Sequence, residues 1–262
     1  LFRELEFKQL LAELESQAPA GPSPVADIRP LNGPHAVADC LERVRAEEAA
    51  LWCAPVGPAH APSALVMAVA ADEATAWVGR LDRAWLATAD GTMLRDWLAG
   101  PSPKLGHDIK LAARWLDRLG CKLIGVQGDT MLAAYLLSPA RTSQTLGDLS
   151  AEYADQPLRP LPVLEDDALA AEGREERLAP FGQAACAVFR LHRLLAPKLR
   201  EAGLAALYTE LELPLVEVLA RMERTGIALD VPYLAGLGSS MATELARLPE
   251  EVYRLAGPAF NV

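Results

Sequence analysis

The stretch from Tyr208 to Asp230 constrains the fold more than any other part of this sequence. Its apolar residues recur at helical spacing and its charged residues mostly fall on the other side, which is typical of an amphipathic helix. Gly226 then supplies a left-handed stop. Asp230 is a good N-cap with Pro232 in the first turn, so a second long helix is expected to run to about Leu255. The sequence here predicts two helices joined by one short extended link.

Size and composition are those of a soluble globular protein. The chain has 262 residues, of which 51% are hydrophobic and 23% charged, enough apolar material for one large domain or two small ones. Its longest apolar run, residues 61–71, is too short for a membrane helix, and charged residues at the N-terminus argue against a signal peptide. We therefore expect a cytoplasmic protein without a membrane segment.

The formal net charge of -10 bears on nucleic-acid binding. Proteins that hold DNA by themselves usually present a basic face that displaces counterions from phosphate. Either this chain does not bind nucleic acid alone, or a small basic patch is hidden inside an acidic average.

Cysteine and tryptophan usage indicates a packed interior. The four cysteines are scattered, with no Cys-x-x-Cys pair, so we expect buried reduced thiols and neither zinc nor disulfides. The tryptophans lie inside apolar segments, and core packing is favoured over base stacking for all five: Trp52, Trp77, Trp85, Trp97 and Trp115.

The first 27 residues have the composition of a linker. Leucines recur at helical spacing over residues 1–15, and residues 18–24 are rich in proline and glycine. A helix followed by such a spacer fits a chain cut from something larger. An ordinary N-terminal helix and loop explains the same composition.

The middle of the chain has the order of an α/β domain. After a helix at 36–50, short apolar stretches predict antiparallel strands, and alternating helices and strands follow, which implies a mixed sheet with helices on its faces. The expected strands are 51–56, 64–70, 76–79, 84–87, 104–106 and 122–126. The expected helices are 93–98, 108–119, one capped by Asp129 that runs to 137, 146–153 and 176–202.

An acidic run, Glu165-Asp166-Asp167, lies in a proline-containing stretch at 156–176. It could be read as a metal site. We favour an exposed loop, because no histidine or further carboxylate lies at coordinating spacing.

Three strings resemble the bacterial DNA polymerase I family, the family A polymerases. The string from Glu210 to Asp230 is similar to the junction between the 3′-to-5′ exonuclease and polymerase domains. The segment 128–139 resembles a helix inside that exonuclease domain, and 255–262 resembles the start of the thumb. The resemblance implies a ribonuclease H-like fold followed by long C-terminal helices. It divides the chain into a linker helix and Pro-rich spacer (1–27), an exonuclease-like domain (28–203), and the junction helix with the start of the thumb (204–262).

The family's exonuclease uses carboxylates to hold two divalent metals that activate the attacking hydroxide. It supplies an Asp-x-Glu pair on the first strand, an Asp after a Gly-x-x-x-Lys-x element, and a Tyr-x-x-x-Asp on a later helix. The corresponding positions in this chain are held by residues that cannot ligate a metal: Pro55, Gly57, Ala112, Phe181 and Ala185. The resemblance therefore implies a degenerate exonuclease domain, with no metal and no cofactor in this segment.

Two nearby polar residues invite a catalytic reading. Asp108 shares a helix face with Ala112, but one turn of rise separates them, and we expect it to be the N-cap of the helix that begins at Ile109. His107 is expected to be a boundary residue and not a ligand.

Two alternatives remain open at this point. One is a residual metal-dependent 3′-to-5′ exonuclease with a rebuilt ligand set drawn from Glu47, Glu48, Asp72, Glu73 or Asp108. The other is a protein-interaction module that uses the acidic surface, although such a module does not demand the junction string.

The resemblance also carries expectations for the parent protein. The polymerase motifs would lie far beyond residue 262, so the polymerase domain of the same chain would be the partner, with primer–template DNA and Mg²⁺ bound there. We expect a monomer located in the cytoplasm with the nucleoid.

Overall fold

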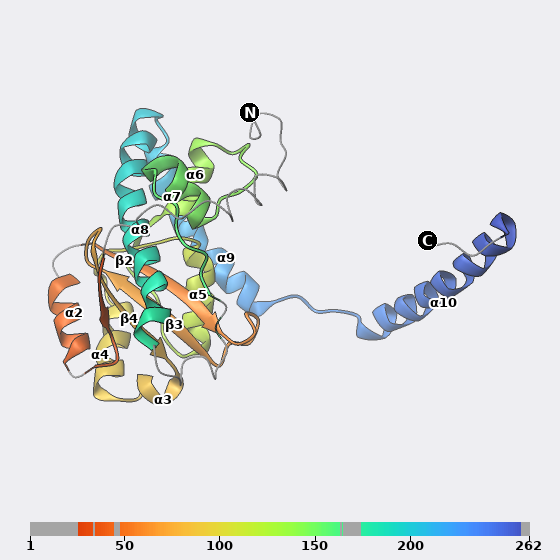
Figure 1. Cartoon of the computed structure of the whole chain (residues 1–262), viewed down its shortest axis with the longest axis horizontal. Coiled ribbons are helices and arrows are strands. Elements are labelled where there is room, and N and C mark those ends of the chain that lie inside the picture. The colour runs from red at the N-terminus through yellow and green to blue at the C-terminus, as the bar shows by residue number, and fades with distance from the viewer. Residues whose placement is uncertain (1–25, 34, 45–47, 163, 165–173, 258–262) are drawn as a thin grey trace. The chain divides into compact units, whose positions relative to one another are not determined.

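The structure, a computed structural model, describes residues 26–33, 35–44, 48–162, 164 and 174–257. The chain divides into two units, residues 1–221 and 222–262. The first contains a six-stranded sheet with its covering helices, and the second contains the end of α9 and all of α10 (Figure 1). The strands are β1 (Asp27–Pro30), β2 (Ala49–Val56), β3 (Ala64–Ala70), β4 (Thr75–Leu81), β5 (Lys104–Gly106) and β6 (Val126–Asp129). The helices are α2 (Ala36–Val44), α3 (Arg83–Leu86), α4 (Ala89–Leu98), α5 (Ile109–Arg118), α6 (Thr130–Leu137), α7 (Leu146–Ala154), α8 (Arg174–Glu201), the π-helical η2 (Leu207–Glu212), α9 (Leu213–Thr225) and α10 (Val231–Ala256).

The sheet is mixed, as the sequence predicted. Its strand order is β1-β4-β3-β2-β5-β6. The central strands β2, β3 and β4 form an antiparallel meander, whereas β1 pairs parallel to β4, and β5 and β6 continue parallel to β2. Strands β1 and β6 are therefore the edges of the sheet among the described residues.

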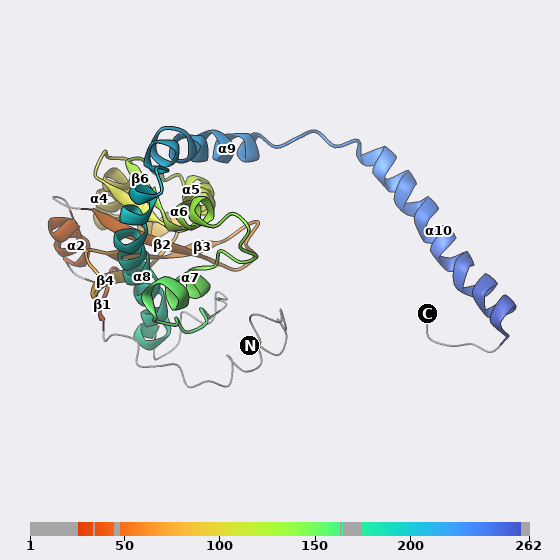
Figure 2. The same cartoon turned by 90° about the horizontal axis from the view of Figure 1, so that it is seen from above.

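Alternation along β3 builds two hydrophobic cores, one on each face of the sheet. Val66, Ala68 and Ala70 face the core covered by α8, and Leu65 and Met67 face the other. Figure 2 shows α7 and α8 on one side of the sheet and α4 and α5 on the other. We call these the α8 core and the α5 core.

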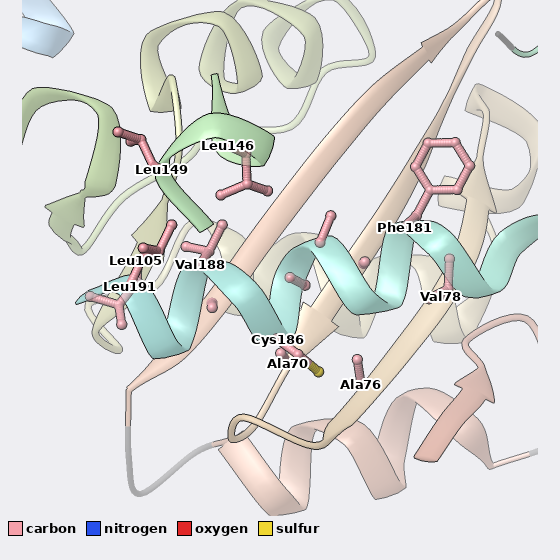
Figure 3. Close-up of a cluster of buried hydrophobic side chains, with 14 of the residues drawn as sticks. Ala70, Ala76, Val78, Leu105, Leu146, Leu149, Phe181, Cys186, Val188 and Leu191 are labelled. Atoms are coloured by element: carbon pink, nitrogen blue, oxygen red, sulfur yellow. The ribbon is translucent and has the colours of Figure 1, made fainter. Parts of the chain in front are cut away.

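Helix α8 crosses β2, β3 and β4 and supplies much of the α8 core. Figure 3 shows that core, with Phe181 and Val188 projecting from α8. Gly182 allows close approach, because a Cβ atom there would lie 2.6 Å from Ile28 Cδ1 and 3.0 Å from Val78 Cγ2. The helix therefore lies closer to β1 and β4 than a larger residue would permit.

Two expected strands are corrected. The segment 84–87 is not a strand, because the Asp82 carboxylate accepts the Trp85 N–H at 2.8 Å and begins the short helix α3. The strand expected at 122–126 instead spans Val126–Asp129. Gly125, with φ of 78°, lies so close to the Ser102 carbonyl that a Cβ would sit 2.4 Å from it, and regular pairing begins after this turn.

Several expectations concern residues at the margins of the described structure. Strand β1 begins at Asp27, one residue before the predicted domain boundary, and was not foreseen. The N-terminal helix, the Pro-rich spacer and the acidic run 165–167 lie outside the described residues.

The four cysteines are buried and free, and Trp77, Trp97 and Trp115 lie in the α5 core, as predicted.

The junction begins with a π-helical turn. Pro214 has no N–H and its ring would clash with the carbonyl four residues earlier in an α-helix. The backbone widens before it, and the Leu213 N–H bonds to the Tyr208 carbonyl, five residues back. Helix α9 follows and ends before Gly226, whose φ is 71°, as the sequence predicted.

Helix α10 begins as predicted. The Asp230 carboxylate accepts the Tyr233 N–H at 3.0 Å, and Pro232 lies in the first turn. Among the helices that the structure describes, none combines the length and the apolar character that crossing a bilayer would require.

Candidate functional site

The first motif position lies at the end of β2. Pro55 pairs with Leu65 of β3 and is half-buried. Gly57 follows the strand with φ of 81°, and its N–H donates to the Leu164 carbonyl at 2.9 Å. Neither residue offers a side-chain oxygen to a cation, and the described part of 51–71 contains no acidic residue.

The other three positions are packed in the two cores. Ala112 in α5 is 7% exposed and lies in the α5 core. Phe181 and Ala185, one turn apart in α8, are 0% exposed and lie in the α8 core. The structure thus brings Phe181 and Ala185 together and places Ala112 in the cluster on the other face of the sheet.

A polar network lies at the ends of β5 and β6, and Asp129 is its centre. Its Oδ1 accepts N–H groups from Asp108 at 3.2 Å, Met131 at 2.8 Å and Leu132 at 3.3 Å, while its Oδ2 accepts the Ile109 N–H at 2.8 Å. The same carboxylate therefore caps both α5 and α6. The cap on α6 confirms the sequence prediction.

Asp108 occupies the N-cap position of α5, as predicted, but its side chain does not cap the helix. Its backbone is left-handed, with φ of 49°, and its side chain makes no capping hydrogen bond to α5. Asp129 holds the first amides of α5 instead, and it does so from the next strand. The left-handed conformation is one that aspartate tolerates better than most residues.

Burial dominates the electrostatics of Asp129. It raises the pKa of this carboxyl to about 6, although the backbone N–H groups of Ile109, Leu132 and Met131 act in the opposite direction. Nearby Asp108 adds a small further rise to that pKa. The described partners of this carboxylate are backbone N–H groups, so its structural role is helix capping.

His107 is a half-buried boundary residue, as expected. Its Nδ1 lies 3.0 Å from the Thr130 hydroxyl, and its ring is 5.9 Å from that of Trp52. Burial lowers the pKa of His107 to about 4, so the ring is neutral near pH 7. A neutral imidazole offers no positive charge to a phosphate.

The residues of the alternative ligand set are held elsewhere. Asp72 caps the β3–β4 turn by accepting the N–H groups of Ala74 and Thr75. Glu73 is paired with two arginines of α8, and Glu48 lies 4.0 Å from His192. Glu47 lies outside the described residues. Over the part of the chain that the structure describes, no three His, Cys, Asp or Glu side chains are placed to share a metal ion.

Tyr208 is a member of the network that sequence reasoning missed. Its hydroxyl accepts the Asp129 N–H at 2.6 Å and donates to the Asp129 carbonyl at 3.0 Å. The two residues are 79 positions apart. The sequence carried only a weak signal for this contact, namely a tyrosine on the apolar side at the start of an amphipathic helix.

The fold and the motif positions define a ribonuclease H-like domain of the exonuclease type. A solved structure of similar size shares this fold: the chain superposes on Brucella melitensis NrnC bound to pGG with a TM-score of 0.62, at 17% identity, over 78% of this chain and 95% of that one. A sequence profile described as "DNA polymerase I, ribonuclease H-like domain" matches residues 60–160. That match includes Ala112 and stops short of Pro55, Gly57 and α8.

Relatives at higher identity narrow the assignment. The chain is 37% identical to DNA polymerase I of Mycobacterium tuberculosis over 211 residues, which cover 78% of this chain and 23% of the relative. It is 31% identical to DNA polymerase I of Geobacillus stearothermophilus over 271 aligned residues, covering all of this chain and 29% of the relative. These matches identify the chain as a member of the DNA polymerase I family.

One solved structure agrees with the family at moderate identity. It is described as the POL domain of Pol1 from M. smegmatis in complex with DNA primer-template and dNTP. The TM-score is 0.66 at 30% identity, over 89% of this chain and 38% of that one. The present chain thus spans about a quarter of the length of the curated relatives that it matches.

Proposed function

We propose that residues 28–203 form a catalytically inactive exonuclease-like domain whose role is architectural. The observation that carries this proposal is the simultaneous loss of every metal-binding position of the family motifs. Four carboxylates and one phenol are replaced by Pro55, Gly57, Ala112, Ala185 and Phe181. A two-metal hydrolase without these acids has nothing with which to hold its cations.

The packing around two of the aligned positions also supports the proposal. The methyl groups of Ala112 and Ala185 are buried in cores on opposite faces of the sheet. Magnesium in proteins keeps several waters and binds through carboxylates. The residues present at these positions therefore do not fit a Mg²⁺ pair.

We further propose that the domain supports the polymerase domain of a DNA-directed DNA polymerase. In that protein the polymerase domain would bind Mg²⁺ and primer–template DNA, and the protein would be a monomer in the cytoplasm with the nucleoid. The support is the family assignment and the junction string from Glu210 to Asp230, which contains α9 and ends at the N-cap of α10. The reading frame around this segment tests it: two carboxylate-bearing polymerase motifs downstream are expected, and a frame without them contradicts the proposal.

The inactivity has a direct test. The purified chain is incubated with a single strand labelled on its 5′ end, in magnesium and separately in manganese, and the products are resolved on a denaturing gel. We expect no shortening above a mock purification from cells that carry the empty vector. Progressive shortening that co-purifies with the chain through two different columns would overturn the proposal.

A binding measurement complements the gel. A cation that binds only the folded state raises the melting temperature, and the rise grows with the logarithm of its free concentration once that exceeds the dissociation constant. We expect millimolar manganese and millimolar calcium to leave the melting temperature of the chain equal within error. A rise specific to manganese would revive a ligand set that includes Glu47, which lies outside the described residues.

A further inference from the structure

The end of β6 is an open edge of the sheet, and Tyr208 closes it. Among the described residues, strand β6 pairs with β5 alone, with Gly106 opposite Asp129. The main-chain N–H and C=O of Asp129 are both directed to the Tyr208 hydroxyl, at 2.6 and 3.0 Å. The Tyr208 hydroxyl thus satisfies both main-chain groups of Asp129, which a neighbouring strand would otherwise do, because it accepts from the N–H and donates to the carbonyl.

The environment of Tyr208 keeps this arrangement intact. The side chain is 4% exposed and belongs to the α8 core. Burial raises the pKa of the phenol well above its usual range, so the hydroxyl retains the proton with which it donates. A buried hydroxyl that lost either partner would leave a main-chain group of Asp129 unpaired.

Asp129 connects that phenol to two helices. Its main chain binds Tyr208 while its carboxylate caps α5 and α6. Tyr208 itself lies in η2, the first turn of the junction. The other side-chain hydrogen bond described for η2 is local, from Thr209 to the Ala205 carbonyl. Asp129 is therefore the point at which the junction and two helix starts of the nuclease-like domain meet.

We propose that Tyr208 and Asp129 form a clasp that fixes the start of the junction to the sheet, and that its release frees η2 while the sheet stays folded. The clasp would set where the helix leading out of the domain begins. This inference goes beyond the architectural role proposed above and does not require the domain to be inactive. It assigns to Tyr208 a positioning role that neither the motifs nor the comparisons give it.

Hydrogen exchange of the whole chain, with the Tyr208→Phe variant, tests the clasp. Phenylalanine keeps the buried ring and removes both hydrogen bonds. Because each net hydrogen bond contributes about 1 kcal/mol, we expect the Asp129 amide and the amides of η2 to exchange at least about fivefold faster. Amides of β3, in the middle of the sheet, should keep their exchange rates. The matched control is Tyr135→Phe, which removes a hydroxyl from a tyrosine that is 48% exposed in α6, and it should leave both regions unchanged.

Two results would overturn the clasp. One is exchange of the Asp129 and η2 amides that stays within twofold of the wild type in Tyr208→Phe. The other is an equal acceleration of the β3 amides, which would make Tyr208 an ordinary core residue. If the variant does not fold, native-state exchange of the unmodified chain in low urea decides: the Asp129 and η2 amides should open together before β3, and exchange only through global unfolding contradicts the proposal.

Discussion

Asp129 Oδ2 accepts the backbone N–H of Ile109 at 2.8 Å, so the first amide of α5 is held by a residue 20 positions later in the chain. The residue directly before α5, Asp108, leaves that amide to Asp129 and adopts a left-handed backbone. One buried carboxylate therefore serves the N-termini of two helices, α5 and α6. Stability at this end of the sheet depends on that single side chain.

The first prediction concerns the removal of this carboxylate. Asp129→Ala leaves four N–H groups without their acceptor, one on Asp108 and three in α5 and α6. Losing one N-cap costs about 1 kcal/mol and an unsatisfied buried donor about 1–3 kcal/mol, so we expect the free energy of unfolding to fall by about 2–4 kcal/mol. Urea denaturation followed by circular dichroism measures the loss.

The matched control for this prediction is Asp108→Asn. Asparagine tolerates the left-handed backbone, and the Asp108 side chain caps nothing in α5, so the change should be within about 0.5 kcal/mol. A loss for Asp108→Asn as large as that for Asp129→Ala would mean that the cap assignment is wrong.

The second prediction is a pH dependence that is specific to Asp129. Burial raises the pKa of its carboxyl to about 6, above the ordinary value of 3.8. Between these two values the folded protein holds a proton that the unfolded chain has released, so this residue stabilises the fold as the pH falls through 6. His107 acts in the opposite direction, because its pKa is lowered to about 4 and the unfolded histidine takes up a proton first.

A difference measurement separates the two groups. The stability of the wild type minus that of Asp129→Asn cancels the contribution of His107 and leaves that of Asp129. We expect this difference to shift in favour of the wild type by about 2 kcal/mol between pH 7 and pH 4. A shift in favour of the variant would show that the four N–H groups outweigh burial and hold the pKa below its ordinary value.

Local chemistry in the sequence was enough to predict most elements of the fold. The caps at Asp129 and Asp230, the stop at Gly226 and the mixed sheet all follow from residues close to one another in the chain. The errors arose where a residue distant in the sequence determines the local structure. The Asp108 side chain was expected to cap α5, but the carboxylate that does so belongs to Asp129, which becomes its neighbour only when β5 and β6 pair.

The site was harder to predict than the fold. Motif matching predicted which positions carry a carboxylate in the family and none in this chain. The structure adds that two of them, Ala112 and Ala185, are packed into different cores. The contact between Tyr208 and Asp129 joins residues 79 apart and has no local signature. That the domain is inactive, and where the domain boundaries at 28 and 204 fall, remain predictions.

The third prediction is the cost of returning an acid to α8. Ala185 is 0% exposed, so an aspartate there would carry an unpaired charge into the α8 core. We expect Ala185→Asp to lower the free energy of unfolding by about 3–5 kcal/mol at pH 7. Millimolar manganese should not restore the loss, because one carboxylate cannot hold the ion. Thermal unfolding with and without the metal measures both effects.

Ala185→Asn separates charge from size in that experiment. Asparagine has nearly the same volume as aspartate and no charge. The aspartate variant should be the less stable of the two at pH 7, and the gap should close towards pH 4, where the introduced carboxyl becomes protonated. A gap that is independent of pH would attribute the loss to steric overpacking alone.

The fourth prediction compares two arginines that share one acid. Glu73, on the β3–β4 turn, pairs with Arg190 at 3.3 Å and with Arg193 at 3.0 Å. The Arg190 side chain is 13% exposed and also donates to the Glu73 main-chain carbonyl at 3.1 Å, whereas the Arg193 side chain is 67% exposed. We expect Arg190→Ala to cost about 1–2 kcal/mol of unfolding free energy and Arg193→Ala less than about 0.5 kcal/mol.

Repeating both substitutions in a Glu73→Gln background shows which bonds are responsible. The glutamine lacks the charge that attracts Arg193, so Arg193→Ala should become neutral there. Arg190→Ala should keep a measurable cost, because the main-chain carbonyl at position 73 still accepts from the guanidinium. Equal costs for the two arginines in either background would mean that neither the burial of Arg190 nor its bond to the main-chain carbonyl adds to stability. The shorter distance at Arg193 makes the comparison sharp: if distance alone decided, Arg193 would be the costlier residue to remove.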